Sequence, residues 1–188
     1  MKRIVTVAVA LVFLSSCGNY KLIGAKRRDI NTFYSVHPQI EWNALRTSNF
    51  EVWTVDGVDL AAIYFVKGLK DGDTLFEPKR GTEVKEWPSF RKYMKGNEVA
   101  ELVVDSMSAA GLSFVESSGL RPAQFGERMG FRFELRFLTP NGLRKKGLTI
   151  GVLSEERLYL IIYLGTAEHY YEKYETKVER LIDSIDTL

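Results

Sequence analysis

Two histidines are the residues of this chain best suited to acid–base or metal chemistry. His169 follows Glu168 in the first turn of a predicted helix, where an imidazole could act as a general base or a metal ligand. His37 precedes Pro38, which favours an extended or turn conformation. No second histidine stands four residues from His169, and Cys17 is the one cysteine, so the spacing of a zinc site is missing. We therefore expect His169 to be a partly exposed histidine that packs its ring edge on its neighbours.

Other motifs that carry chemistry fail on their spacing. Asp71-Gly72-Asp73 begins like a calcium loop, but Leu75 occupies the third alternating ligand position, so a turn is favoured. The serines lack a Gly-x-Ser-x-Gly element, and neither a phosphate-binding glycine loop nor a dinucleotide fingerprint is present. A Ser-His-Asp triad built from distant residues stays open, because triads are defined by geometry. We expect no catalytic residue, no metal and no cofactor, and hence a protein that is not an enzyme.

One segment combines aromatic and basic residues at the end of an irregular stretch, Lys67–Gly96. Its members are Lys85, Trp87, Phe90, Arg91, Lys92, Tyr93 and Lys95. Because Trp, Tyr and Arg are enriched at binding hot spots, this segment is a candidate binding loop. In the alternative interpretation, Trp87 and Phe90 fill the core and the cations face solvent.

A second candidate site is a small-ligand pocket between the sheet and the last helix. Its predicted lining is Tyr159, Tyr163, His169, Tyr170 and Tyr171. Such pockets are usually concave and mostly apolar, with a few polar groups. Nearby in the sequence, Arg144-Lys145-Lys146 forms a basic run at a predicted hairpin tip. It could meet an anionic surface, but protection of the hairpin end from edge pairing is the favoured interpretation.

The N-terminus has the composition of an export signal. Lys2 and Arg3 precede the apolar run Ile4–Leu14, and Ser15-Ser16-Cys17 follows. The sequence Leu14-Ser15-Ser16-Cys17 resembles the lipobox of bacterial lipoproteins. The resemblance implies cleavage before Cys17, fatty acylation of Cys17 and anchoring to a membrane. Gly18 stands where an aspartate would favour the inner membrane, which implies the outer membrane, with the domain facing the periplasm.

Composition and charge limit the remaining possibilities. We expect a signal peptide at residues 1–16, a lipidated cysteine and tether at 17–32, and one globular domain at 33–188. The chain has 26 Lys and Arg against 24 Asp and Glu, and Lys2 and Arg3 leave with the signal, so the mature chain is balanced in charge. No electrostatic feature indicates nucleic acid as a partner.

Hydrophobic periodicity predicts an α+β domain. A hairpin is expected around Asp56-Gly57, and a helix from Asn97, as its cap, to Ala110, ended by Gly111. The expected strands are Phe50–Val55, Val58–Val66, one beginning at Leu112–Val115, Phe131–Phe137, Leu148–Val152 and Leu158–Leu164. Leu158–Leu164 is apolar at every position, which is typical of a strand covered on both faces. A long helix, Ala167–Ile185, capped by Thr166, is expected to close the chain.

This order resembles the PsbP-like α/β/α sandwich, in which an antiparallel sheet lies between helices. The residues that carry the resemblance are the strands Phe131–Phe137 and Leu158–Leu164 and the final helix beginning near Tyr170-Tyr171. Because the family includes accessory and assembly proteins, the resemblance implies binding rather than catalysis. We expect a lipid-anchored, non-enzymatic accessory module of the cell envelope with an envelope protein as partner. A periplasmic small-ligand binder is the alternative, and a hydrolytic enzyme ranks last.

Overall fold

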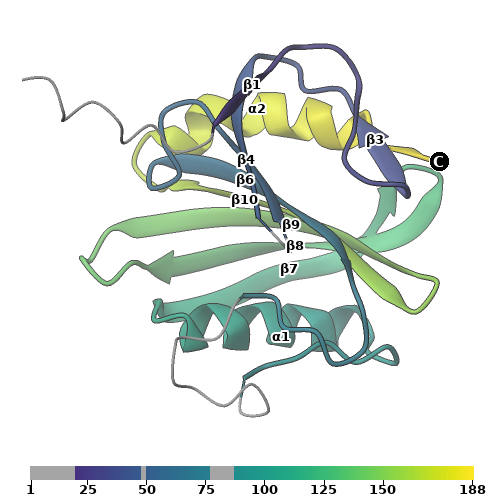
Figure 1. The fold of residues 1–188 in the computed structure, drawn as a ribbon. Coiled ribbons are helices and arrows are strands. Elements are labelled where there is room, and N and C mark those ends of the chain that lie inside the picture. The colour runs from purple at the N-terminus through teal and green to yellow at the C-terminus, as the bar shows by residue number, and fades with distance from the viewer. Residues whose placement is uncertain (1–19, 48–49, 77–86) are drawn as a thin grey trace, which may run out of the picture.

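The chain forms one large antiparallel sheet with a helix on each face (Figure 1). The computed structural model describes residues 20–47, 50–76 and 87–188. Helix α1 (Gly96–Ala109) covers one face, and helix α2 (Tyr170–Asp183), near the C-terminus, covers the other. The predicted α+β class, with an antiparallel sheet between helices and a helix near the C-terminus, is therefore confirmed.

The main sheet has eight strands, and a three-stranded sheet lies beside α2. In spatial order the main strands are β1 (Lys21–Ile23), β4 (Trp42–Arg46), β5 (Phe50–Thr54), β6 (Ala61–Leu69), β10 (Arg157–Thr166), β9 (Arg144–Ser154), β8 (Arg128–Leu138) and β7 (Ser113–Phe125). The small sheet consists of β11 (Asp186–Thr187), β3 (Tyr34–Val36) and β2 (Arg28–Asp29). Consecutive strands β7 to β10 pair as neighbours, which explains why short connections suffice in this half of the chain.

Strand β10 divides the core into two layers because its side chains alternate between the faces of the sheet. Leu158, Leu160 and Ile162 pack with the buried residues of α1, whereas Ile161 and Tyr163 pack with those of α2. Each layer stabilises the contact between the sheet and one helix, because burial of apolar surface contributes about 25 cal/mol per Å². The prediction that Leu158–Leu164 is covered on both faces is confirmed.

The folded domain begins earlier than predicted. Residues of the expected tether belong to the fold: Lys21–Ile23 pairs with β4, and Ile23 and Ile30 are buried. These isolated apolar residues lie among charges and have no local periodicity. Only their long-range pairing fixes them, so the sequence pattern did not indicate them.

Several element boundaries also differ from the prediction. Helix α1 begins at Gly96 rather than after an Asn97 cap, because the Lys95 N–H donates to the Glu98 carboxylate at 2.8 Å. Thr166 belongs to β10, and α2 begins only at Tyr170, whose N–H donates to the Thr166 hydroxyl at 3.4 Å. Strand β6 begins at Ala61, so the β5–β6 connection spans residues 55–60 and is longer than a two-residue turn.

Candidate functional site

The tyrosines of the predicted pocket lie in the core beneath α2. Tyr163 stacks on Tyr171 with 5.1 Å between ring centroids, and its hydroxyl donates to the Tyr171 carbonyl oxygen at 2.7 Å. Burial raises the pKa of the Tyr171 hydroxyl to about 12 and raises that of Tyr163 as well. Tyr159 stacks on Phe33 at 4.1 Å. The rings of Tyr159 and Tyr163 are buried in the core, where they stabilise the fold, and Tyr171 lines a small cavity of about 140 Å³ between the sheet and α2.

The two histidines are far apart in the structure. His169 precedes α2, where its exposed ring packs edge-on against Tyr170 at 4.9 Å. The His37 N–H donates to the Ser184 hydroxyl, which follows the other end of α2. A helix of 14 residues is about 21 Å long, since each residue adds about 1.5 Å. The structure therefore does not bring the histidines together, and His169 has the packing role predicted for it.

The aromatic and basic segment divides into a buried part and an exposed part. Trp87 and Phe90 are buried in the core, as the alternative interpretation proposed, and Lys85 lies outside the described residues. Tyr93 is 81% exposed, with the Lys92 ammonium 5.1 Å from its ring centroid. Lys92 also donates to Glu156 at 2.9 Å. We call the exposed residues Arg91, Tyr93 and Lys95, together with the partly exposed Lys92, the basic loop.

The basic run Arg144-Lys145-Lys146 lies within β9 and not at the hairpin tip as predicted, because residues 139–143 form the turn. With neighbouring strands it lines a cavity of about 510 Å³. We call this cavity the basic cleft and define it by Phe114, Glu116, Arg136, Arg144, Lys145, Lys146 and Glu168. The cleft thus combines four basic side chains with two acidic ones.

Pairing accounts for only part of this charge. Arg144 donates to Glu168 at 2.8 Å, and Lys146 lies 3.7 Å from Glu172. Arg136 is exposed between Lys146 and Glu116 on the neighbouring strands and forms no ion pair with another described residue. The cleft therefore retains unneutralised positive charge.

Lys145 is the most unusual cation of the cleft. Only 6% of its surface is exposed, and its ammonium donates to the backbone carbonyl oxygen of Asp59 at 2.5 Å. Burial lowers the pKa of this ammonium, since removal from water penalises the charged form. Within the described part of the chain no carboxylate lies within ion-pair distance of it. The only partners of this buried ammonium among the described residues are backbone carbonyl oxygens. An anion beside it would therefore interact with it more strongly than it would with a lysine in water.

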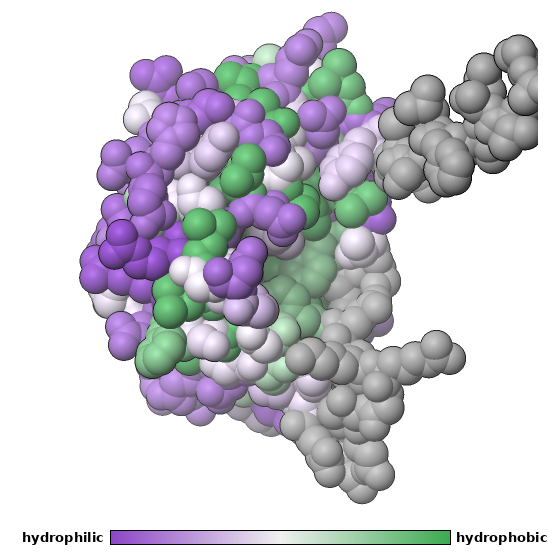
Figure 2. Space-filling view, turned by 90° about the vertical axis from the view of Figure 1, so that its left-hand side faces the viewer, coloured by the Kyte–Doolittle hydropathy of each residue, from purple (hydrophilic) through white to green (hydrophobic). Residues whose placement is uncertain are grey.

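An apolar recess adjoins the basic cleft on the same end of the molecule. A middle cavity of about 350 Å³ shares Phe137 and Lys145 with the cleft. A third cavity of about 180 Å³ shares Tyr64, Leu112 and Leu164 with the middle one. We call this third cavity the apolar recess; it is lined mainly by Tyr64, Phe76, Met107, Leu112, Ile162 and Leu164. Figure 2 views this end and shows hydrophobic residues in a hollow bordered by hydrophilic ones.

The wall of the cleft contains a strained aromatic residue. Phe114 has φ of +52°, a left-handed conformation that is rare for bulky residues, and its side chain is 78% exposed. Strain of this kind costs about 1–3 kcal/mol and persists where the surrounding structure enforces it. Here β7 begins with a register shift between Ser113 and Glu116, which turns Phe114 out of the regular ladder.

The sequence pattern indicated the basic run but not the cleft around it. Phe137 and Leu112 were identified as strand residues, and nothing in their local pattern indicated a cavity. Phe137 and Leu112 come to lie near Lys145 through the pairing of β8 with β9 and the contact of Lys145 with the β5–β6 connection. That connection is far from β9 in the sequence. The basic run itself was the one available signal.

Comparison with known proteins assigns the fold. No family model and no curated protein matches the chain. Cyanobacterial PsbP (CyanoP) from Synechocystis sp. PCC 6803 has a similar solution structure, with a TM-score of 0.56 and 9% identity over 96% of this chain and 99% of that one. LpqN, involved in cell envelope biogenesis of Mycobacterium tuberculosis, matches with a TM-score of 0.38 and 9% identity over 93% and 87% of the two chains. The chain therefore has a PsbP-like fold, as its residue pattern predicted.

Within residues 20–47, 50–76 and 87–188, no helix is long and apolar enough to span a bilayer. The same residues contain no group of three or more His, Cys, Asp or Glu side chains arranged to hold a metal ion.

Proposed function

We propose that this protein is a lipid-anchored, non-enzymatic binding module of the cell envelope, with its domain in the periplasm and the basic cleft as its binding site. The observation that carries the proposal is the buried Lys145 ammonium at the junction of the cleft and an apolar cavity. Concave, largely apolar sites with a few well-placed polar groups are the usual form of ligand sites. The PsbP-like fold supplies the rigid strands on which this site lies.

The anchoring part of the proposal rests on the sequence Leu14-Ser15-Ser16-Cys17, which lies outside the described residues. Several acyl chains contribute about 0.8 kcal/mol for each buried methylene, so a multiply acylated cysteine would anchor the chain stably. Exchange of Cys17 for serine should move the protein from the membrane fraction to the soluble fraction. Quantitative recovery of this variant with membranes would contradict anchoring at Cys17.

The binding part is tested on protein taken from its own cells. We expect native mass spectrometry of the purified Cys17→Ser chain to show a mass added by a co-purified small molecule. The Lys145→Met variant should lose that mass, because the ammonium that lines the junction of the cleft and the middle cavity is gone. Unaltered mass for the parent protein would count against a ligand-binding role.

A second contact surface is supported by a separate observation. Tyr93 is 81% exposed beside Arg91 and Lys95 at the start of α1, and exposed aromatic residues flanked by cations are typical of protein contacts. We propose the basic loop as the surface for an envelope protein partner. Cross-linking in intact cells, with mass spectrometry as the readout, should identify one dominant partner.

A further inference from the structure

We infer that the middle cavity and the apolar recess form one binding site for an amphiphile with an anionic head group and a single alkyl chain, with Lys145, which the middle cavity shares with the basic cleft, at the head-group end. This inference rests on the proposed function and deepens it, because it names the chemical class of the ligand. It follows from three features: the continuity of the cavities, the composition of their walls and the position of Lys145.

The middle cavity and the apolar recess adjoin on the α1 side of the sheet. They share Tyr64, Leu112 and Leu164, and Lys145 also lines the middle cavity. Their volumes are about 350 and 180 Å³, and together they reach the range of about 300–1,000 Å³ usual for small-molecule sites. An extended ligand could therefore contact both.

The recess suits an alkyl chain. Its lining comes from β6, β10, α1 and the segment before residue 77, and its residues are nearly all apolar. Met107 contributes a flexible, polarizable side chain that adapts to an irregular ligand. The Tyr64 ring packs edge-on against Phe50 at 6.0 Å, so this wall is held in place from behind. Each methylene that leaves water in such a recess contributes about 0.8 kcal/mol.

The head group is selected by charge. Lys145 lies in the wall shared by the cleft and the middle cavity, and its desolvation has already occurred in the folded protein. A carboxylate or phosphate there would gain a charge-assisted hydrogen bond without a further desolvation cost for the lysine. Arg136 pairs with Lys146 on the α2 face of the sheet, whereas Lys145 pairs with Phe137 on the α1 face, so Arg136 lies outside this head-group site.

Acidic residues at the site do not cancel this charge. Glu168 is paired with Arg144, and Glu116 is the one other acidic residue of the cleft. Asp59 lines the middle cavity, but its contact with Lys145 is through the backbone carbonyl, and its side chain lies on the exposed β5–β6 connection. A cationic head group would meet the Lys145 ammonium, and its binding would be disfavoured.

The test uses probes that share a twelve-carbon chain and differ in head group. Laurate, dodecyl phosphate and dodecyltrimethylammonium are titrated as monomers into the full chain carrying Cys17→Ser, and binding is followed by calorimetry. We expect both anions to bind and the cation to bind at least about tenfold more weakly, the factor typical of losing one charge-assisted hydrogen bond. Equal affinity for the cation and the anions would overturn the inference.

Variants locate the site. Lys145→Met keeps the aliphatic stem and should weaken anion binding at least about tenfold. Leu112→Asp should weaken all three probes. Matched controls are Arg136→Gln, on the other face of the sheet, and Met129→Asp, exposed on β8, both outside the middle cavity and the recess. Unchanged anion binding in Lys145→Met would overturn the inference.

The source of the amphiphile is decided separately. Vesicles containing lysophosphatidylglycerol, which has one acyl chain, and laurate are incubated with the protein, and native mass spectrometry shows whether the lysophospholipid or only the free laurate is retained. Retention of either anion supports the site, and retention of neither overturns it. These titrations do not depend on Cys17, so a failure of the anchoring proposal and a failure of this inference give different results.

Discussion

Gly68 shows how a single missing side chain allows an aromatic ring to pack directly against a strand. Its φ is +104°, and a Cβ atom there would lie 2.8 Å from the ring of Tyr159. That ring stacks on Phe33 at 4.1 Å, and the pairing of β10 with β6 shifts register between Leu158 and Tyr159. The glycine therefore permits both an unusual backbone conformation and the close approach of an aromatic ring.

Replacement of Gly68 by alanine should destabilise the protein. A left-handed conformation in a non-glycine residue costs about 1–3 kcal/mol, and displacement of the Tyr159 ring adds to that cost. Urea unfolding should show a free energy of unfolding lower by at least about 1 kcal/mol. Gly24→Ala is the control, because its Cβ would meet no atom within 4 Å and its φ is not positive. Equal stability of Gly68→Ala and the parent would show that the ring and the strand readjust freely.

The hydrogen-bonded cluster around Glu51 is a feature that the sequence did not predict. Glu51 is fully buried, and its carboxylate accepts hydrogen bonds from Arg28 at 3.0 Å, Arg46 at 2.9 Å and Trp53 at 2.9 Å. A buried carboxylate is tolerated only when it is paired and hydrogen-bonded in this way. Because Arg28 belongs to β2 and Arg46 to β4, no local pattern around Glu51 could have predicted the cluster.

At the scale of elements, the predictable part of the fold is the part built from neighbours in sequence. Strands β8, β9 and β10 have regular apolar alternation and pair in sequence order, so pattern alone predicted them. Strand β7 runs to Phe125, but it lies at an edge, is mostly exposed and contains register shifts, so only its start was predicted. The candidate site lies at the ends of these strands. Its cavities form only where several elements meet, so the pattern within a single element cannot predict them.

Helix α2 is tied to the β5–β6 connection by Asp56, and this contact predicts a pH dependence. The Lys173 ammonium and the Tyr174 hydroxyl each donate to the Asp56 carboxylate at 2.6 Å, and these hydrogen bonds lower the pKa of Asp56. A group with a lowered folded-state pKa stabilises the protein above its unfolded pKa of about 3.9 and loses that contribution as the pH falls through the folded value.

Asp56→Asn should therefore lower the melting temperature at pH 7 but leave it unchanged at pH 2. Thermal unfolding followed by circular dichroism between these limits measures the difference, which should shrink progressively below pH 4. Because the contact is partly exposed to solvent, the effect should be small and should diminish at high salt. Asp105→Asn, on the exposed face of α1 and without a hydrogen-bond partner among the described residues, should show no such pH-dependent difference. A constant difference at every pH would contradict the assignment to Asp56 ionisation.

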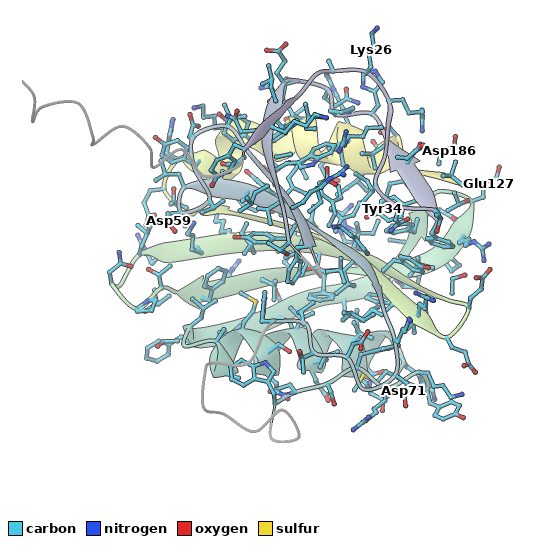
Figure 3. All side chains as sticks on the ribbon, viewed as in Figure 1. Lys26, Tyr34, Asp59, Asp71, Glu127 and Asp186 are labelled. Carbon is cyan, nitrogen blue, oxygen red and sulfur yellow. The ribbon has the colours of Figure 1, made fainter. Side chains whose placement is uncertain are left out.

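At the scale of the whole molecule, two surfaces with unpaired cations lie at opposite ends. Asp59, which lines the middle cavity, and Asp71, whose carboxylate accepts the Lys92 N–H at 3.1 Å, mark these ends in Figure 3. The sheet and α1 extend between them (Figure 1). A ligand in the basic cleft therefore leaves the basic loop free, and both surfaces can be occupied on one molecule.

This separation predicts that the two surfaces can be disabled independently. Charge reversal at Arg91 and Lys95 should lower the yield of the cross-linked partner roughly tenfold, because complementary charge governs encounter and register, and it should leave laurate binding unchanged. Lys145→Met should have the opposite pair of effects. Lys92 is left in place because it pairs with Glu156 and its loss would disturb the loop itself. If Lys145→Met alone abolished the cross-link, the protein partner would occupy the ligand site, and the division of the molecule into a ligand end and a partner end would be wrong.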